Sequence, residues 1–337
     1  MTLKDFSQKK AHEMKTRGIE YAIRSGVQEA MMKGARPILQ HRSTPIWDER
    51  WDVALVLDAT RFDVFKEVLV ESYDAVALNA ELYDNLEHNW SVGSASPEWI
   101  NETFAPTNHA DIRNTGYVTA NPFSGHDPEK DNILDPSVYP LRNRPLGYLD
   151  EVWADQWPMQ SNLATVDPQE MTERGLWAWQ HRDRLGIDKV IVHYMQPHIP
   201  FRSRPEWSAG WDLAGFGLGG GEGKDVWLQL RDGEIDEYEL WNAYKDNLRW
   251  VFGEIVDWYN GTDAKILVTA DHGNAMGEWG QWSHPPNSAN PVLRKVPWVV
   301  IDGTGEYVRD ATPKGDPPEH SNTGNGVTDR LEALGYR

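Results

Sequence analysis

The sequence contains no cysteine, which excludes disulfides, thiolate metal ligands and a cysteine nucleophile. It also has no apolar run of about 18 residues, the length that a membrane-spanning helix needs. Its first residues, "MTLKDFSQKK", lack the apolar stretch of a secretory signal. From these absences we expect a cytoplasmic protein whose metal ligands would be oxygen and imidazole nitrogen atoms.

Basic residues are scarce: 33 Lys and Arg stand against 52 Asp and Glu, for a net charge of −19. Such an excess of negative charge repels phosphate backbones, so we expect no nucleic-acid partner. Dense carboxylates are also typical of proteins that stay soluble in strong salt, which suggests a halophilic source. With 337 residues, 39% of them hydrophobic, the chain can bury a sizeable core.

The first 36 residues are basic, unlike the rest of the chain, and Ile19, Ile23, Val27 and Met31 recur at a spacing of four. This pattern predicts an amphipathic helix. We therefore divide the chain into a basic helical segment, 1–45, and a single domain with insertions, 46–337. The helix either packs on its own domain or makes a peripheral contact with an acidic membrane surface or a partner. The oligomeric state stays open.

Hydrophobic runs alternate with helical patterns along the domain. We expect strands at 53–57, 117–120, 189–195, 265–270 and 296–301, and helices at 62–71, 97–104, 168–185 and 235–259. This order predicts an α/β fold with a mostly parallel mixed sheet sandwiched between helices. The Pro-, Gly- and Trp-rich stretches 121–160 and 202–234 are expected to form long loops over the site. Their aromatic side chains suit a sugar or lipid-headgroup substrate.

Acidic and imidazole side chains follow three of the expected strands. Asp58 follows the first, His198 follows 189–195, and Asp271 and His272 follow 265–270. Each alone could simply cap a helix. Because ligands bind at the carboxyl ends of parallel strands, together they predict a divalent cation. Mn²⁺ or Zn²⁺ suits these ligands best, with Mg²⁺ and Ca²⁺ as alternatives. His193, within a strand, is interpreted as a core histidine.

A candidate nucleophile lies in "NWSVGSASPEW". Ser96 precedes Pro97, the order of an N-cap followed by proline at the first helical position. A hydroxyl there lies where helix amides favour an anion, and beside a cation it can become a nucleophile. Plain capping is the alternative. Ser94 also remains possible as the nucleophile.

Five segments resemble the alkaline phosphatase superfamily, and most closely its sulfatase-related branch. They occur in the order found in that family: "VALVLDATRFDVF" (53–65), "GSASPEW" (93–99), "YMQPHIPF" (194–201), "VTADHGNAMGE" (268–278) and "RKVPWVVIDG" (294–303). The most specific is the Asp-His-Gly strand end followed by the Val-Pro strand.

The resemblance implies roles for the matching residues. Asp58, Asp271 and His272 would bind the metal, and Ser96 would be the nucleophile. His198 would contact the transferred group and take part in catalysis.

Two further residues are implied to bind substrate. Arg61 would either steady the anion or pair with Asp63. His284 falls where many relatives place a histidine or lysine near the substrate.

The sequence also departs from the sulfatase pattern. Ala59 replaces a second Asp, and the serine segment lacks the downstream arginine that accompanies oxidation to formylglycine. We therefore predict a metal-dependent hydrolase or transferase that acts on phosphate mono- or diesters, or on sulfate esters, through a serine. The substrate would be a small-molecule, glycan or lipid-headgroup ester. The alternatives are a sulfatase with a modified serine and a non-catalytic binding protein that retains the fold.

Overall fold

The computed structural model describes residues 43–72, 77–125, 141, 144–156, 165–208, 225–306 and 310–318, together with Gly26. The helix expected in the first 36 residues lies outside these ranges, Gly26 excepted, as do most of the residues expected to form long loops. The division of the chain at residue 45 therefore stays a prediction.

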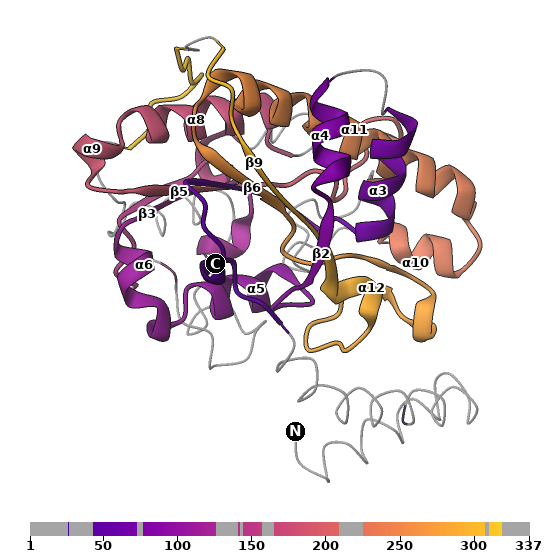
Figure 1. Cartoon of the computed structure of the whole chain (residues 1–337). Helices are drawn as coiled ribbons and strands as arrows, with labels where there is room; N and C mark the ends of the chain where they lie inside the picture. The colour runs from indigo at the N-terminus through magenta and orange to yellow at the C-terminus, as the bar shows by residue number, and fades with distance from the viewer. Residues whose placement is uncertain are drawn as a thin grey trace.

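A seven-stranded sheet in the order β2-β9-β6-β1-β5-β3-β4 forms the centre of the domain (Figure 1). β4, β3, β5, β1 and β6 are parallel, whereas β9 is antiparallel to both β6 and β2. The strands are β1 Val53–Leu57, β2 Glu87–Trp90, β3 Thr115–Thr119, β4 Tyr148–Glu151, β5 Lys189–Tyr194, β6 Lys265–Thr269 and β9 Lys295–Asp302. The predicted mostly parallel mixed sheet is confirmed.

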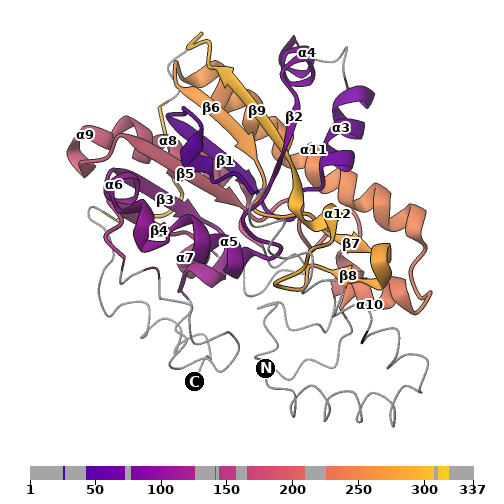
Figure 2. The same ribbon diagram turned by 60° about the horizontal axis from the view of Figure 1, so that its bottom comes forward.

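Helices cover both faces of this sheet (Figure 1). One layer holds α3 Phe62–Glu71, α4 Ala77–Asp84, α8 Pro168–Gln180 and α11 Glu237–Gly261; the other holds α5 Ser96–Thr103 and α6 His109–Arg113. In Figure 2, α5 lies near α12 (Pro291–Arg294) and the hairpin of β7 (Ala275–Met276) and β8 (Trp282–Ser283). The shorter helices are η1 Ile46–Asp48, η2 Pro106–Asn108, η3 Pro122–Gly125, α7 Trp153–Gln156, α9 Arg182–Leu185, η5 Pro205–Ser208, α10 Val226–Arg231 and η6 Glu278–Gly280.

Alternate residues of β1 enter two separate hydrophobic cores. Val53 and Leu55 pack with side chains of α3, α8 and α11. Ala54 and Val56 pack with Trp99 of α5 on the opposite face. Because both faces are buried, the strand shows no polar alternation in its sequence.

Some short elements differ from the sequence expectation. The stretch 121–160 contains β4, and 202–234 contains α10, where we expected only loops. β4 reads "YLDE", too short and too acidic to resemble a buried strand. The edge strand β2 reads "EHNW" and is equally polar. The helix expected at 168–185 is interrupted at His181, which separates α8 from α9.

Within the ranges that the structure describes, no helix is both long enough and apolar enough to cross a membrane.

The close packing of α8 on the sheet gives a first prediction. A Cβ on Gly175 would lie 2.6 Å from a Val192 methyl and 2.8 Å from the Trp258 ring. We expect Gly175→Ala to lower the free energy of unfolding by about 1–3 kcal/mol through overpacking. A Cβ on Gly253, at an exposed position of α11, would have no heavy atom within 4 Å among the described residues. Gly253→Ala should therefore add about 1 kcal/mol to the free energy of unfolding through helix propensity. Urea denaturation measures both; equal effects of the two substitutions would contradict this packing.

Candidate active site

Asp58, Asp271 and His272 meet at the carboxyl ends of the neighbouring strands β1 and β6. One ligand atom from each residue lies within 4.8 Å of the others. Asp58 is 1% exposed, and the other two are fully buried. The structure therefore brings together the three residues that the sequence predicted as metal ligands.

The atoms that face one another in this cluster are all hydrogen-bond acceptors. His272 Nδ1 lies 2.7 Å from the Gly273 carbonyl and must donate to it, so Nε2 presents a lone pair. That lone pair lies 3.3 Å from Asp271 Oδ2 and 3.7 Å from Asp58 Oδ1. Neither carboxylate oxygen has a hydrogen-bond partner. Buried acceptors without a donor between them fit a divalent cation.

The two carboxylates differ in how firmly they hold a proton. Burial raises the pKa of Asp58 well above its ordinary value, and the charge of Asp271 raises it further. Burial acts in the same direction on Asp271, but His272, His193 and the Ala59 amide outweigh it and lower the pKa of that carboxyl. Without a cation, the pair keeps its proton on Asp58.

The Ser96 hydroxyl lies within hydrogen-bond distance of two side chains of this cluster. Its Oγ lies 3.1 Å from His272 Nε2 and 3.3 Å from Asp58 Oδ2. The predicted N-cap is wrong by one residue: Ala95 is the N-cap, and Ser96 is the first residue of α5. The Ser96 side chain therefore does not cap α5, and its hydroxyl faces the cluster from the first turn of the helix.

The hydroxyl of Ser94, the alternative nucleophile, forms hydrogen bonds with groups outside the cluster. Its Oγ lies 2.9 Å from Glu98 and 3.0 Å from the Pro285 carbonyl, and it accepts from the Ser288 amide. These bonds hold the turn before α5. The geometry favours Ser96.

Arg294 locks the same turn in place. It is 1% exposed and pairs with Glu98 at 2.7 Å, while donating to the carbonyls of Ser91 and Val92. Arg294 comes from the segment that resembles the Val-Pro strand of the family. It thus ties the strand β9 region to the turn that carries Ser96.

His198 and His284 lie on the partly exposed side of the cluster. Their Nε2 atoms are 3.0 Å apart, and the His284 ring lies 4.5 Å from that of His272. His198 Nδ1 donates to the Ile199 carbonyl, so its Nε2 accepts from His284. Burial lowers the pKa of His198 to about 4, and burial with the neighbouring histidines lowers that of His284 well below its ordinary value. Both are neutral near pH 7.

Arg61 adopts the second of the two roles that the sequence left open. Its guanidinium pairs with Asp63 and Glu278, both at 2.7 Å, and donates to the Asn274 carbonyl. It also lies 5.1 Å from the Trp241 ring centre. These contacts join α3 to the loop after β6, and substrate contact by Arg61 stays a prediction.

The Asp-His-Gly turn depends on a close backbone approach. A Cβ on Gly273 would lie 2.0 Å from the Val292 carbonyl oxygen, so only glycine fits against α12. Opposite it, Ala59 has a φ of 60°, and its amide donates to Asp271 Oδ1 at 3.0 Å. Ala59 therefore orients the Asp271 carboxylate through its backbone amide.

Two residues near the cluster were not predicted to have a role in it. Asn121 follows β3, and its side-chain amide donates to Asp58 Oδ2 at 2.7 Å. Its position just after an expected strand was a usable signal. His193 was interpreted as a core histidine, yet its Nε2 lies 3.5 Å from Asp271 Oδ2. Nothing in its apolar sequence neighbourhood marks that contact.

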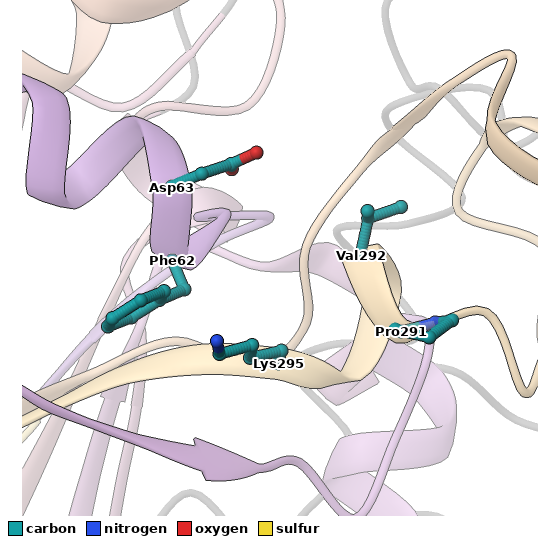
Figure 3. Close-up of a pocket in the computed structure, with 5 residues that line it drawn as sticks. All are labelled: Phe62, Asp63, Pro291, Val292 and Lys295. Carbon is teal, nitrogen blue, oxygen red and sulfur yellow. The ribbon is translucent and has the colours of Figure 1, made fainter.

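A pocket of about 180 Å³ opens between α3, α12 and the start of β9 (Figure 3). Lys295 Nζ lies 4.4 Å from the Phe62 ring centre in its wall. The lining consists of Phe62, Asp63, Pro291, Val292 and Lys295, so none of the cluster residues faces it. This pocket is separate from the chemistry described above.

Comparison with known proteins found no matching family model and no matching curated protein. Among solved structures, the chain is similar to the soluble domain of lipooligosaccharide phosphoethanolamine transferase A from Neisseria meningitidis, with 13% identity and a TM-score of 0.45, over 75% of this chain and 76% of that one. It is also similar to the C-terminal periplasmic domain of phosphoethanolamine transferase EptC from Campylobacter jejuni, with 13% identity and a TM-score of 0.41, over 84% and 88%. Likeness this distant carries no conclusion about activity.

Proposed function

We propose that this protein is a divalent-metal-dependent enzyme of the alkaline phosphatase superfamily that hydrolyses or transfers phosphate esters, with Ser96 as its nucleophile. The observation that carries the proposal is the position of the Ser96 hydroxyl, within 3.3 Å of both Asp58 and His272. The proximity of Asp58, Asp271 and His272 also argues against the alternative of a non-catalytic binding protein that retains only the fold.

Asp58, Asp271 and His272 would hold the cation. When bound, a divalent cation would supply Lewis-acid activation of the serine and neutralise charge on the phosphoryl oxygens. Zn²⁺ and Mn²⁺ suit the mixed oxygen and imidazole ligands best.

The protein's own groups suit an in-line attack on phosphorus. The Ser96 hydroxyl lies within hydrogen-bond distance of two acceptors, Asp58 Oδ2 and His272 Nε2, so its proton points into the cluster and an oxygen lone pair is left for the substrate. His198 and His284 flank the accessible side, where a phosphoryl oxygen would take the place of His198 Nε2 as the acceptor of the His284 N–H. A bond from Ser96 Oγ to phosphorus forms as the ester bond breaks, and water or an acceptor alcohol then releases the phosphoryl group.

The substrate is proposed to be a phosphate mono- or diester of a glycan, a lipid headgroup or a small molecule. The proposal prefers phosphate over sulfate because the serine segment lacks the downstream arginine that accompanies oxidation to formylglycine. A contact between the basic N-terminal segment and a membrane surface would fit a lipid-headgroup substrate, and it stays part of this proposal.

Exchanging each serine of the turn tests the nucleophile. Ser96→Ala should lower kcat on 4-nitrophenyl phosphate or its bis-ester by about 10³-fold or more, because the attacking oxygen is lost. Ser94→Ala is the matched control: it loses hydrogen bonds of the turn but should keep most of the turnover. Mass spectrometry of the Ser96 peptide should find an unmodified or phosphorylated serine. A formylglycine at this position, or an active Ser96→Ala variant, would contradict the assignment.

Replacing Asp58 by asparagine tests the ligand cluster in two ways. The folded state raises the pKa of this carboxyl, so its protonated form is favoured and stability falls as pH rises above its unfolded pKa. In chelator at pH 7.5, the free energy of unfolding of Asp58→Asn should therefore be higher than that of the parent.

Added Zn²⁺ should raise the melting temperature of the parent but leave that of Asp58→Asn unchanged. The measurements are urea denaturation in chelator and thermal melts with and without Zn²⁺. A variant that is less stable in chelator, or that still responds to Zn²⁺, would count against the cluster.

A further inference from the structure

His193 lies directly behind the proposed ligand Asp271, on β5, and is fully buried. Its Nδ1 is 2.7 Å from the hydroxyl of Tyr117, a buried residue of the neighbouring strand β3. Its Nε2 has no hydrogen-bond partner and lies 3.5 Å from Asp271 Oδ2. The three side chains form a line from the interior to the cluster.

The proton positions in this line follow from electrostatics. If His193 carried its proton on Nδ1, its bare Nε2 lone pair would face a carboxylate oxygen, which is repulsive. The favoured tautomer has the proton on Nε2, directed toward Asp271. Tyr117 then donates its hydroxyl proton to Nδ1, which fixes that tautomer.

The two oxygens of Asp271 are consequently held by different groups. Oδ1 accepts from the backbone amides of Ala59 and His272, at 3.0 and 2.8 Å. Oδ2, the oxygen that faces His272 Nε2, has only the His193 N–H near it from behind. A carboxylate with one oxygen tied to the backbone and the other braced by an imidazole has a defined orientation.

The pair also touches the helix that carries the nucleophile. The rings of His193 and Trp99 of α5 pack edge to face, with centroids 5.4 Å apart. Two polar groups in this apolar core cost free energy that hydrophobic side chains of similar size would not. The contact of His193 with Asp271 fits a role in the site rather than in packing alone.

We propose that Tyr117 and His193 are positioning residues that hold Asp271 Oδ2 toward the cation, without touching cation or substrate themselves. The inference rests on the proposed function, because it gives Asp271 the part of a metal ligand. It assigns His193 a task beyond that of a core histidine.

Tyr117→Phe tests the pair, because it removes one hydroxyl and keeps the ring. The Zn²⁺ dissociation constant of the full chain at pH 7.5, measured by calorimetry with a competing chelator, should rise at least tenfold. The visible spectrum of bound Co²⁺ should shift as well, since the ligand geometry changes.

Tyr194→Phe is the matched control. Tyr194 is also fully buried, but its hydroxyl bonds Thr172 and Trp258, away from the cluster. This variant should lose stability yet keep the parent's Zn²⁺ affinity and Co²⁺ spectrum. At position 193, His193→Gln keeps an N–H donor and should bind Zn²⁺ more tightly than His193→Leu.

The outcomes separate the two proposals. A parent protein that binds no Zn²⁺ would overturn the proposed function and this inference with it. The inference alone would be overturned if the parent binds Zn²⁺ and Tyr117→Phe binds it equally well. It would also be overturned if His193→Leu and His193→Gln bind Zn²⁺ with the same affinity.

Discussion

The rest of the structure is arranged around an electrostatically unfavourable cluster. In it, two carboxylates and an imidazole lone pair converge in a buried space at the carboxyl ends of β1 and β6. Asp58 Oδ1, Asp271 Oδ2 and His272 Nε2 are all acceptors, and among the described residues no donor lies within hydrogen-bond distance of the two carboxylate oxygens, His193 Nε2 being 3.5 Å from Asp271 Oδ2. In a low-dielectric interior such a cluster is unstable unless a proton or a cation lies within it. A proton on Asp58 resolves it partly, and a divalent cation resolves it fully.

Much of the surrounding structure serves to hold these acceptors together. Arg61 ties α3 to the loop after β6, and Arg294 ties the turn of Ser96 to the region before β9. Both guanidiniums are buried and paired with carboxylates, and these pairs join segments of backbone around the cluster. The neutral histidines His198 and His284 are left as the accessible polar groups beside the cluster.

The central strands and the ligand residues could be predicted from the sequence because both depend on local patterns. Buried parallel strands are continuous apolar runs, and Asp58 and Asp271 directly follow two such runs; the parallel pairing of β1 with β6 then places them side by side. The edge strands β2 and β4 could not be predicted in this way, because each is only four residues long and polar in sequence. The contacts of Arg61 with Glu278, of Asn121 with Asp58 and of His193 with Asp271 join segments distant in sequence, and spacing alone could not specify them.

The central claim is that Asp58, Asp271 and His272 hold one divalent cation next to the Ser96 hydroxyl. Anomalous diffraction at the zinc edge, from crystals of the full chain grown with Zn²⁺, tests it most directly. The account predicts a strong peak among these three side chains, with Ser96 Oγ beside it. A peak bound only by other residues, or none at this cluster with Zn²⁺ in excess, would contradict it.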